Sequence, residues 1–122
     1  MPVKCLDPDV LAKIRQERSE AYLIKLIDMF LKEAPMRIQE AWDGGKAGDY
    51  KKAALSAHIL RCLAENIGAI SIRDLAGNSE TAASGGKEAT LGVSQILFDL
   101  EIAFAETRAC LLIARQGISE QS

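Results

Sequence analysis

The chain has 122 residues, a length that suits one domain with a single hydrophobic core. Hydrophobic residues make up 48% and charged residues 26%, which is typical of a globular protein and excludes a disordered or membrane-embedded one. The formal net charge of −2 argues against nucleic acid as the main partner, because phosphate backbones bind basic surfaces. No apolar run approaches the roughly 20 residues that span a bilayer, and no signal peptide opens the sequence, so we expect a cytoplasmic protein. The three cysteines, Cys5, Cys62 and Cys110, lack metal-type spacing, so we expect free thiols and no metal site.

Proline and glycine divide the sequence into a short opening helix and four longer ones, and no stretch alternates as a half-buried strand would. The opening helix is expected over residues 8–16. The first long helix is expected over residues 19–43, where the dipeptide Gly44-Gly45 ends it. Pro35 lies inside this helix and is expected to kink it, because proline removes one backbone hydrogen bond.

The second half of the chain is expected to form three more helices. Asp49 caps the start of a helix that runs to Ile67 and ends at Gly68. Ser71 begins a segment that resembles a capping box, which predicts a helix from there to about residue 83. The last helix is expected over residues 88–115. Because the connections are short, the sequence predicts an all-α, antiparallel four-helix bundle over about residues 19–115, within one domain of residues 1–122.

The last helix carries two apolar rows. The main row is expected to face the core and consists of Val93, Ile96, Leu97, Leu100, Phe104, Thr107 and Leu111. A second row, on the opposite face, consists of Phe98, Ile102, Ala105 and Ala109. Either the short opening helix covers this second row, or a dimer or partner contact does.

His58 is the only histidine of the chain. A helix advances about 100° per residue, and the apolar residues of this helix fall between roughly 140° and 260° from His58. These core positions are Ala53, Ala57, Leu60, Leu63, Ala64 and Ile67. His58 is therefore expected to be exposed, either as a working residue or as an idle surface histidine.

Small and charged residues share the exposed face with His58. Within about 60° of it lie Lys51, Ala54, Leu55, Arg61, Cys62 and Glu65. Ala54 and Cys62 lie one turn before and one turn after His58, so the ring is open to another protein. Arg61 is placed to neutralise an anion held at the ring, or is simply a solvated charge.

The segment from His58 to Ala69, HILRCLAENIGA, resembles the phosphorylation-site helix of histidine phosphotransfer (HPt) domains, whose pattern is approximately H-x-L-K-G-S-x-x-x-[LI]-G. The proline-containing helix, the start at Asp49 and the acidic Glu80 are similar to the layout of the family. The resemblance covers roughly residues 19–115. Cys62 and Leu63 depart from it, because they stand where the family usually has glycine and a small residue.

The resemblance implies that His58 is phosphorylated, and that it relays the phosphoryl group to and from receiver-domain aspartates in a two-component phosphorelay. Histidine suits this role because neutral imidazole is a good nucleophile. Arg61 would take the position of the family's lysine and help to stabilise the transferred group. Glu80 would accept a hydrogen bond from the inner ring nitrogen of His58, or is a solvated residue, and Gly68 would be structural.

The resemblance also implies the partners. These are response-regulator receiver domains, with a hybrid sensor kinase as a further candidate, and the expected contact residues are Ala54, Leu55, Cys62 and Glu65. The protein itself needs no cofactor, since magnesium is expected only on the partner receiver domain.

Two other classes of function compete with this interpretation. An HPt-like helical adaptor would bind a partner through the same face without accepting phosphate. A conventional enzyme is disfavoured because the chain has no glycine-rich phosphate loop, nucleophile–base pair or cofactor motif. ATP-dependent kinase activity is excluded on the same ground.

Overall fold

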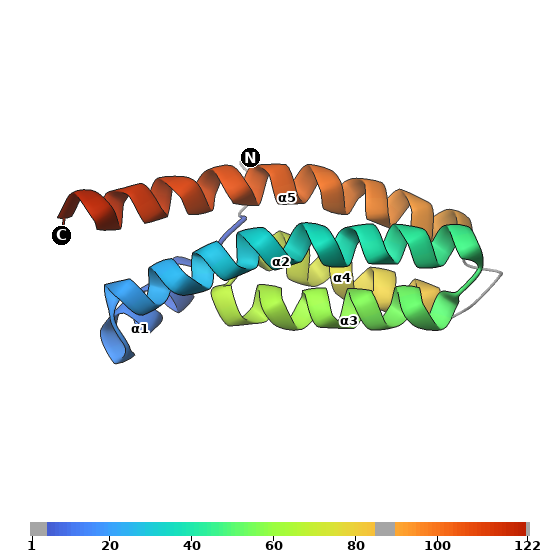
Figure 1. The fold of residues 1–122 in the computed structure, drawn as a ribbon, viewed down its shortest axis with the longest axis horizontal. Helices are drawn as coiled ribbons and strands as arrows, with labels where there is room; N and C mark the ends of the chain where they lie inside the picture. Colours follow the sequence, from blue (N-terminus) through green and yellow to red (C-terminus); the bar gives the residue numbers. More distant parts are fainter. Residues whose placement is uncertain (1–4, 85–89, 122) are drawn as a thin grey trace.

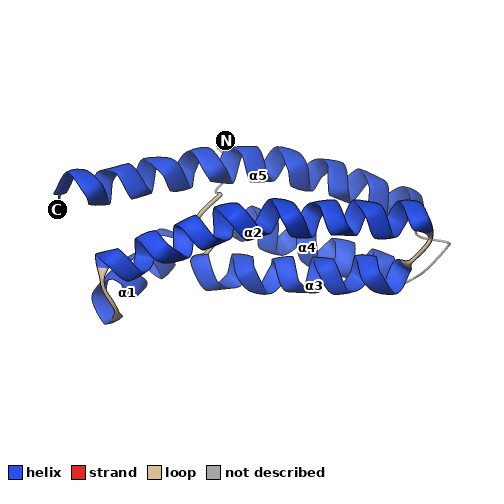
Figure 2. Ribbon diagram, in the orientation of Figure 1, coloured by secondary structure: helices blue, strands red, loops and turns tan. Residues whose placement is uncertain are grey.

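The computed structural model describes residues 5–84 and 90–121, and the side chains of residues 5–84 and 94–117. This part of the chain is helical, with short connections and no strand beyond an isolated bridge between Leu6 and Ala69 (Figure 2). Its helices are α1 (Pro8–Glu17), α2 (Glu20–Ala47), α3 (Tyr50–Ile67), α4 (Ile70–Ser84) and α5 (Thr90–Gln121). The predicted all-α class is confirmed. Within the described residues, no helix combines the length and apolarity needed to cross a membrane.

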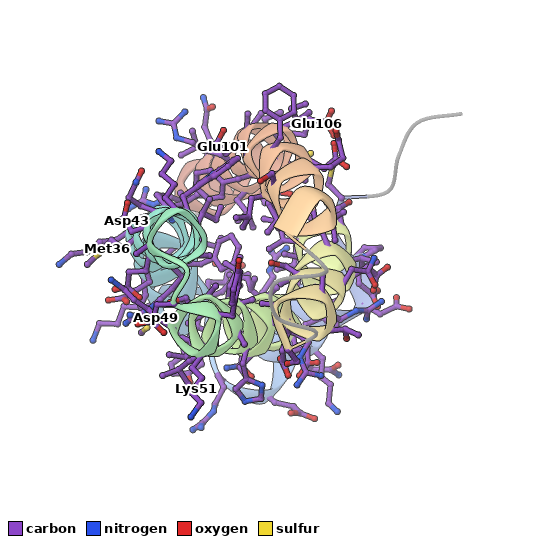
Figure 3. The ribbon with its side chains drawn as sticks, turned by 90° about the vertical axis from the view of Figure 1, so that its right-hand side faces the viewer. Met36, Asp43, Asp49, Lys51, Glu101 and Glu106 are labelled. Atoms are coloured by element: carbon purple, nitrogen blue, oxygen red, sulfur yellow. The ribbon has the colours of Figure 1, made fainter. Side chains whose placement is uncertain are left out.

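The four long helices form the bundle. Each packs against two others, so that α2, α3, α4 and α5 follow one another around the core (Figures 1 and 3). Successive helices run in opposite directions, as predicted (Figure 1). The short α1 packs against α2 and α3 at one end of the bundle.

The core is built from the apolar stripes that helical periodicity predicts. Its largest fully buried apolar side chains are Leu23, Ile27, Leu60, Ile67, Ile72, Leu97, Leu100 and Leu111. Phe30 of α2 and Phe104 of α5 meet with their ring centroids 6.2 Å apart. In α3, the buried residues lie on the face opposite His58, which fixes how this helix is rotated in the bundle.

The predicted end of α2 at Gly44-Gly45 is wrong. The helix continues to Ala47 and ends at Gly48, which adopts the left-handed conformation with φ 72°. Gly44 serves another purpose, because it is buried where α2 crosses α3. A Cβ atom at this position would come within 2.9 Å of the backbone nitrogen of Ala53, so glycine permits the close approach.

Pro35 lies inside α2, and the helix continues on both sides of it. Figure 1 shows the two halves of α2 inclined to one another, in line with the expected kink. The side chain of Pro35 is exposed, so the ring lies on the outer side of the helix.

The predicted capping box at Ser71 is also wrong. The helix α4 begins one residue earlier, at Ile70. The backbone N–H of Ile70 donates to the carbonyl of Cys5 at 3.0 Å, and the N–H of Arg73 donates to the carbonyl of Ala69 at 2.9 Å. The N-terminal segment therefore caps α4 through its backbone, in place of the Ser71 side chain.

The last helix is longer than predicted, since α5 extends beyond residue 115 to Gln121. Its predicted start at Glu88 and the side chain of Val93 lie outside the described residues. The rest of the main row is buried or half-buried, with Thr107 fully buried among apolar side chains.

The opening helix does not cover the second apolar row of α5. Phe98 remains 54% exposed and Ile102 50% exposed. The helix α1 is held on the other side of the molecule, because Val10 packs on Gly68 and the N–H of Asp7 donates to the carbonyl of Gly68 at 2.8 Å. Of the two alternatives that the sequence left open, covering of this row by α1 is therefore wrong.

Candidate functional site

The rotation of α3 turns His58 to the outside. Asp49 caps the start of this helix by accepting a hydrogen bond from the N–H of Lys52 at 3.1 Å, and Gly68 ends it in the left-handed conformation. Between these ends, the core face holds the helix in one orientation. The side chain of His58 is 47% exposed as a result.

Glu80 of α4 reaches the inner nitrogen of this ring. Its Oε2 lies 3.0 Å and its Oε1 3.4 Å from His58 Nδ1. An ionised carboxylate can only accept a hydrogen bond, so Nδ1 carries the proton and donates it. This leaves a lone pair on the outer nitrogen, Nε2, of the neutral ring.

Arg61 lies on the same side of the ring as Glu80. Its Nη2 is 3.1 Å from His58 Nδ1, and its Nε is 3.6 Å from Glu80 Oε2. A guanidinium only donates, and Nδ1 is protonated, so the approach to the ring is a contact, not a hydrogen bond. The attraction that holds Arg61 here is its charge pairing with Glu80, supplemented by Glu65, whose Oε1 lies 3.9 Å from Arg61 Nη1.

Cys62 lies at the outer nitrogen. Its exposed thiol places Sγ 3.8 Å from His58 Nε2, within reach of a weak S–H hydrogen bond to the lone pair. The two ring nitrogens therefore have different surroundings. Nδ1 faces two charged side chains, whereas Nε2 faces a neutral thiol and solvent.

Gly77 is a residue of this site that the sequence reasoning missed. It lies on α4, one turn before Glu80, and a Cβ atom there would be 3.5 Å from Cδ of Arg61. The aliphatic part of Arg61 therefore lies close to α4 at Gly77. The available signal was the spacing of three residues between Gly77 and Glu80, which puts both on one face of a helix.

The other expected contact residues lie around His58 on the same helix. Leu55 is 60% exposed, Glu65 is exposed, and Ala54 is half-buried. Lys51 points outward from α3 (Figure 3). An open hollow of about 300 Å³ adjoins this face and is lined by Tyr50, Lys51, Ala54, Ala83 and Ser84.

Gly68 lies away from the ring of His58, at the end of α3. Its φ of 74° is unfavourable for any residue with a Cβ atom, and that atom would come within 2.8 Å of Val10 Cβ. The described residues contain no group of three or more histidine, cysteine, aspartate or glutamate side chains arranged to hold a metal ion.

The backbone is similar to the crystal structure of histidine-containing phosphotransfer protein B (HptB) from Pseudomonas aeruginosa PAO1, with a TM-score of 0.78. The chain has the fold of a histidine phosphotransfer domain. The similarity covers 94% of this chain and 97% of HptB, at 24% sequence identity. Comparisons with protein-family models and with curated proteins gave no match. The HPt fold that the residues around His58 predicted is therefore confirmed over nearly the whole chain.

Proposed function

We propose that this chain is a histidine-containing phosphotransfer protein of a cytoplasmic two-component phosphorelay. One observation carries the proposal. On an HPt fold, the only histidine of the chain is exposed, and Glu80 holds its Nδ1 so that Nε2 keeps its lone pair. A histidine prepared in this way can accept and release a phosphoryl group.

In the proposed reaction, the lone pair of His58 Nε2 attacks the phosphorus of a receiver's aspartyl phosphate. The N–P bond forms, the O–P bond breaks, and the receiver's aspartate leaves as a carboxylate. The ring gains positive charge as the N–P bond forms, and the carboxylate of Glu80, 3.0 Å from Nδ1, stabilises that charge. The reverse reaction passes the group to a second receiver.

Arg61 has two proposed roles. Its positive charge pairs with the carboxylate of Glu80 and holds that side chain in place for Nδ1. After rotation of its long side chain toward Nε2, the guanidinium would pair with the oxygens of the bound phosphoryl group. Most of the charge neutralisation during transfer is assigned to the partner receiver, whose magnesium ion belongs to that domain.

The proposed docking surface for receiver domains consists of Ala54, Leu55, Cys62 and Glu65. These residues flank His58 on α3, and the apolar Leu55 is exposed at 60%. An exposed apolar side chain beside a reactive group suits a transient partner better than a permanent one, because most of the surrounding face is polar. A hybrid sensor kinase would reach His58 through its own receiver domain.

The thiol of Cys62 favours a second candidate function. Its Sγ lies 3.8 Å from Nε2, on the side from which a phosphoryl group arrives. An HPt-like adaptor that binds receivers without accepting phosphate would have this kind of obstruction.

The test is the transfer of labelled phosphate from a panel of receiver domains charged with a small phosphodonor. We expect the protein to become labelled, with the acid lability of phosphohistidine. The variant His58→Gln should fold normally and remain unlabelled, because the exposed ring contributes little to packing. Labelling of His58→Gln would refute the assignment, and binding of a charged receiver without labelling of the wild type would favour the adaptor.

A further inference from the structure

The exposed row of α5 has a regular spacing that the proposed phosphotransfer does not use. Phe98, Ile102, Ala105, Ala109 and Leu112 follow one another at intervals of four, three, four and three residues. This is the heptad spacing of a helix that packs against another helix along a seam. Phe98 is 54%, Ile102 50% and Leu112 37% exposed, and both alanines are exposed.

The row faces away from the phosphotransfer site. In the end-on view of Figure 3, α5 lies at the opposite side of the bundle from Lys51 of α3. Glu101 and Glu106 lie on the two sides of α5 in this view (Figure 3). Their spacing from Ile102 and Ala105 in the helix places them on the two flanks of the row. A partner seated on the row would leave His58 accessible.

The row is complementary to itself when two copies of α5 run antiparallel. Its N-terminal half is bulky, with Phe98 and Ile102, and its C-terminal half is small, with Ala105 and Ala109. In an antiparallel pair, Phe98 of each copy packs on Ala109 of the other, and Ile102 packs on Ala105. Each large side chain then packs on a small one of the other copy, so that the space between the two helices is filled.

Charge on one flank of the row supports the same arrangement. Heptad positions place Glu101 and Arg108 on one side of the seam, one heptad apart. In the antiparallel pairing above, Glu101 of each copy faces Arg108 of the other, which gives two opposite-charge contacts. A parallel pair would instead bring Glu101 toward Glu106 of the second copy, and these like charges repel.

From this size and charge complementarity we propose that the exposed row of α5 is the interface of an antiparallel homodimer. The other side of the row limits the stability of this dimer, because Asp99 of one copy and Glu106 of the other would face each other and are both acidic. The dimer is therefore weak and reversible. The phosphotransfer sites of its two copies face outward and work independently of it.

Sedimentation velocity of the full chain over a series of concentrations up to about 1 mM tests the proposal. We expect a concentration-dependent dimer, which Ile102→Glu weakens by at least about tenfold because it buries a charge in the seam. Met29→Glu is the matched control, since Met29 is also 50% exposed but lies on α2, and it should leave the dimer unchanged. Circular dichroism checks that both variants are folded.

The orientation is tested by exchanging charges. Glu101→Lys and Arg108→Glu should each weaken the dimer, and the double variant should restore it, because the same two contacts form with reversed signs. A wild type that stays monomeric throughout, or a dimer that survives Ile102→Glu, would overturn the interface. Failure of the double variant to recover would overturn the antiparallel register.

Discussion

Replacement of Gly68 by alanine tests how the N-terminal segment and the end of α3 hold one another. The left-handed backbone at φ 74° costs a residue with a Cβ atom roughly 1–2 kcal/mol. The new Cβ would also lie 2.8 Å from Val10 Cβ and 3.3 Å from the carbonyl oxygen of Asp7. Overpacking of this kind costs roughly a further 1–3 kcal/mol. We therefore expect Gly68→Ala to lower the free energy of unfolding by roughly 2–5 kcal/mol.

Gly48→Ala is the matched control. Gly48 has nearly the same φ, 72°, and also ends a helix, but a Cβ atom there would have no neighbouring atom within 4 Å. Its cost should be the backbone part alone, roughly 1–2 kcal/mol. Chemical denaturation followed by circular dichroism measures both values. Equal losses in the two variants would refute the contact between Gly68 and Val10 as a source of stability.

Three further changes test the site and an ion pair. Arg61→Ala should slow phosphotransfer or shorten the lifetime of phosphohistidine, measured with labelled phosphate, whereas Lys32→Ala should change neither; equal effects would make Arg61 a solvated charge. Cys62→Gly should speed transfer while lowering the free energy of unfolding by up to about 1 kcal/mol, because glycine is the poorer helix former. Slower transfer would show that partners do not approach over this turn. Asp28→Asn should cost less than about 1 kcal/mol at neutral pH, since this ion pair is exposed. The hydrogen bond from Arg115 lowers the pKa of Asp28 in the folded state below its ordinary value of 3.8. The stabilisation by this ion pair is therefore present above 3.8 and is lost as the pH falls through the lowered pKa, where the difference between variant and wild type in urea denaturation should vanish.

The core and the orientation of His58 were predictable because both depend on one helix at a time. The repeat of about 100° per residue fixes which side chains of α3 share a face, whatever the helix packs against. Leu60 and Ile67 are buried and His58 is exposed, as this geometry predicts. The same reasoning placed Leu97 and Leu100 of α5 in the core.

Contacts between segments far apart in the sequence were not predictable from periodicity. The start of α4 was misplaced because Cys5, 65 residues before Ile70, supplies the capping carbonyl through its backbone. The end of α2 was misplaced because Gly44 is needed for a close helix crossing, and Gly48 supplies the left-handed cap. The sequence alone does not distinguish a glycine that permits close helix packing from one that ends a helix. Only the position of α3 against α2 shows which role each glycine has.

The two nitrogens of His58 explain why so little of the site is visible in the sequence. The charged side chains that contact the ring, Glu80 and Arg61, gather at Nδ1, and the contact at Nε2 is the neutral thiol of Cys62. In the proposed phosphotransfer, the chain would orient His58 through Nδ1, and the partner would supply the groups that act at Nε2. Phosphoryl transfer depends mainly on positioning and on neutralising the charge of the transferred phosphoryl group. A partner receiver domain would therefore have to supply the remaining groups at Nε2. Under the proposed function, one exposed histidine, one carboxylate on the neighbouring helix and an accessible turn would be what this chain contributes to the reaction.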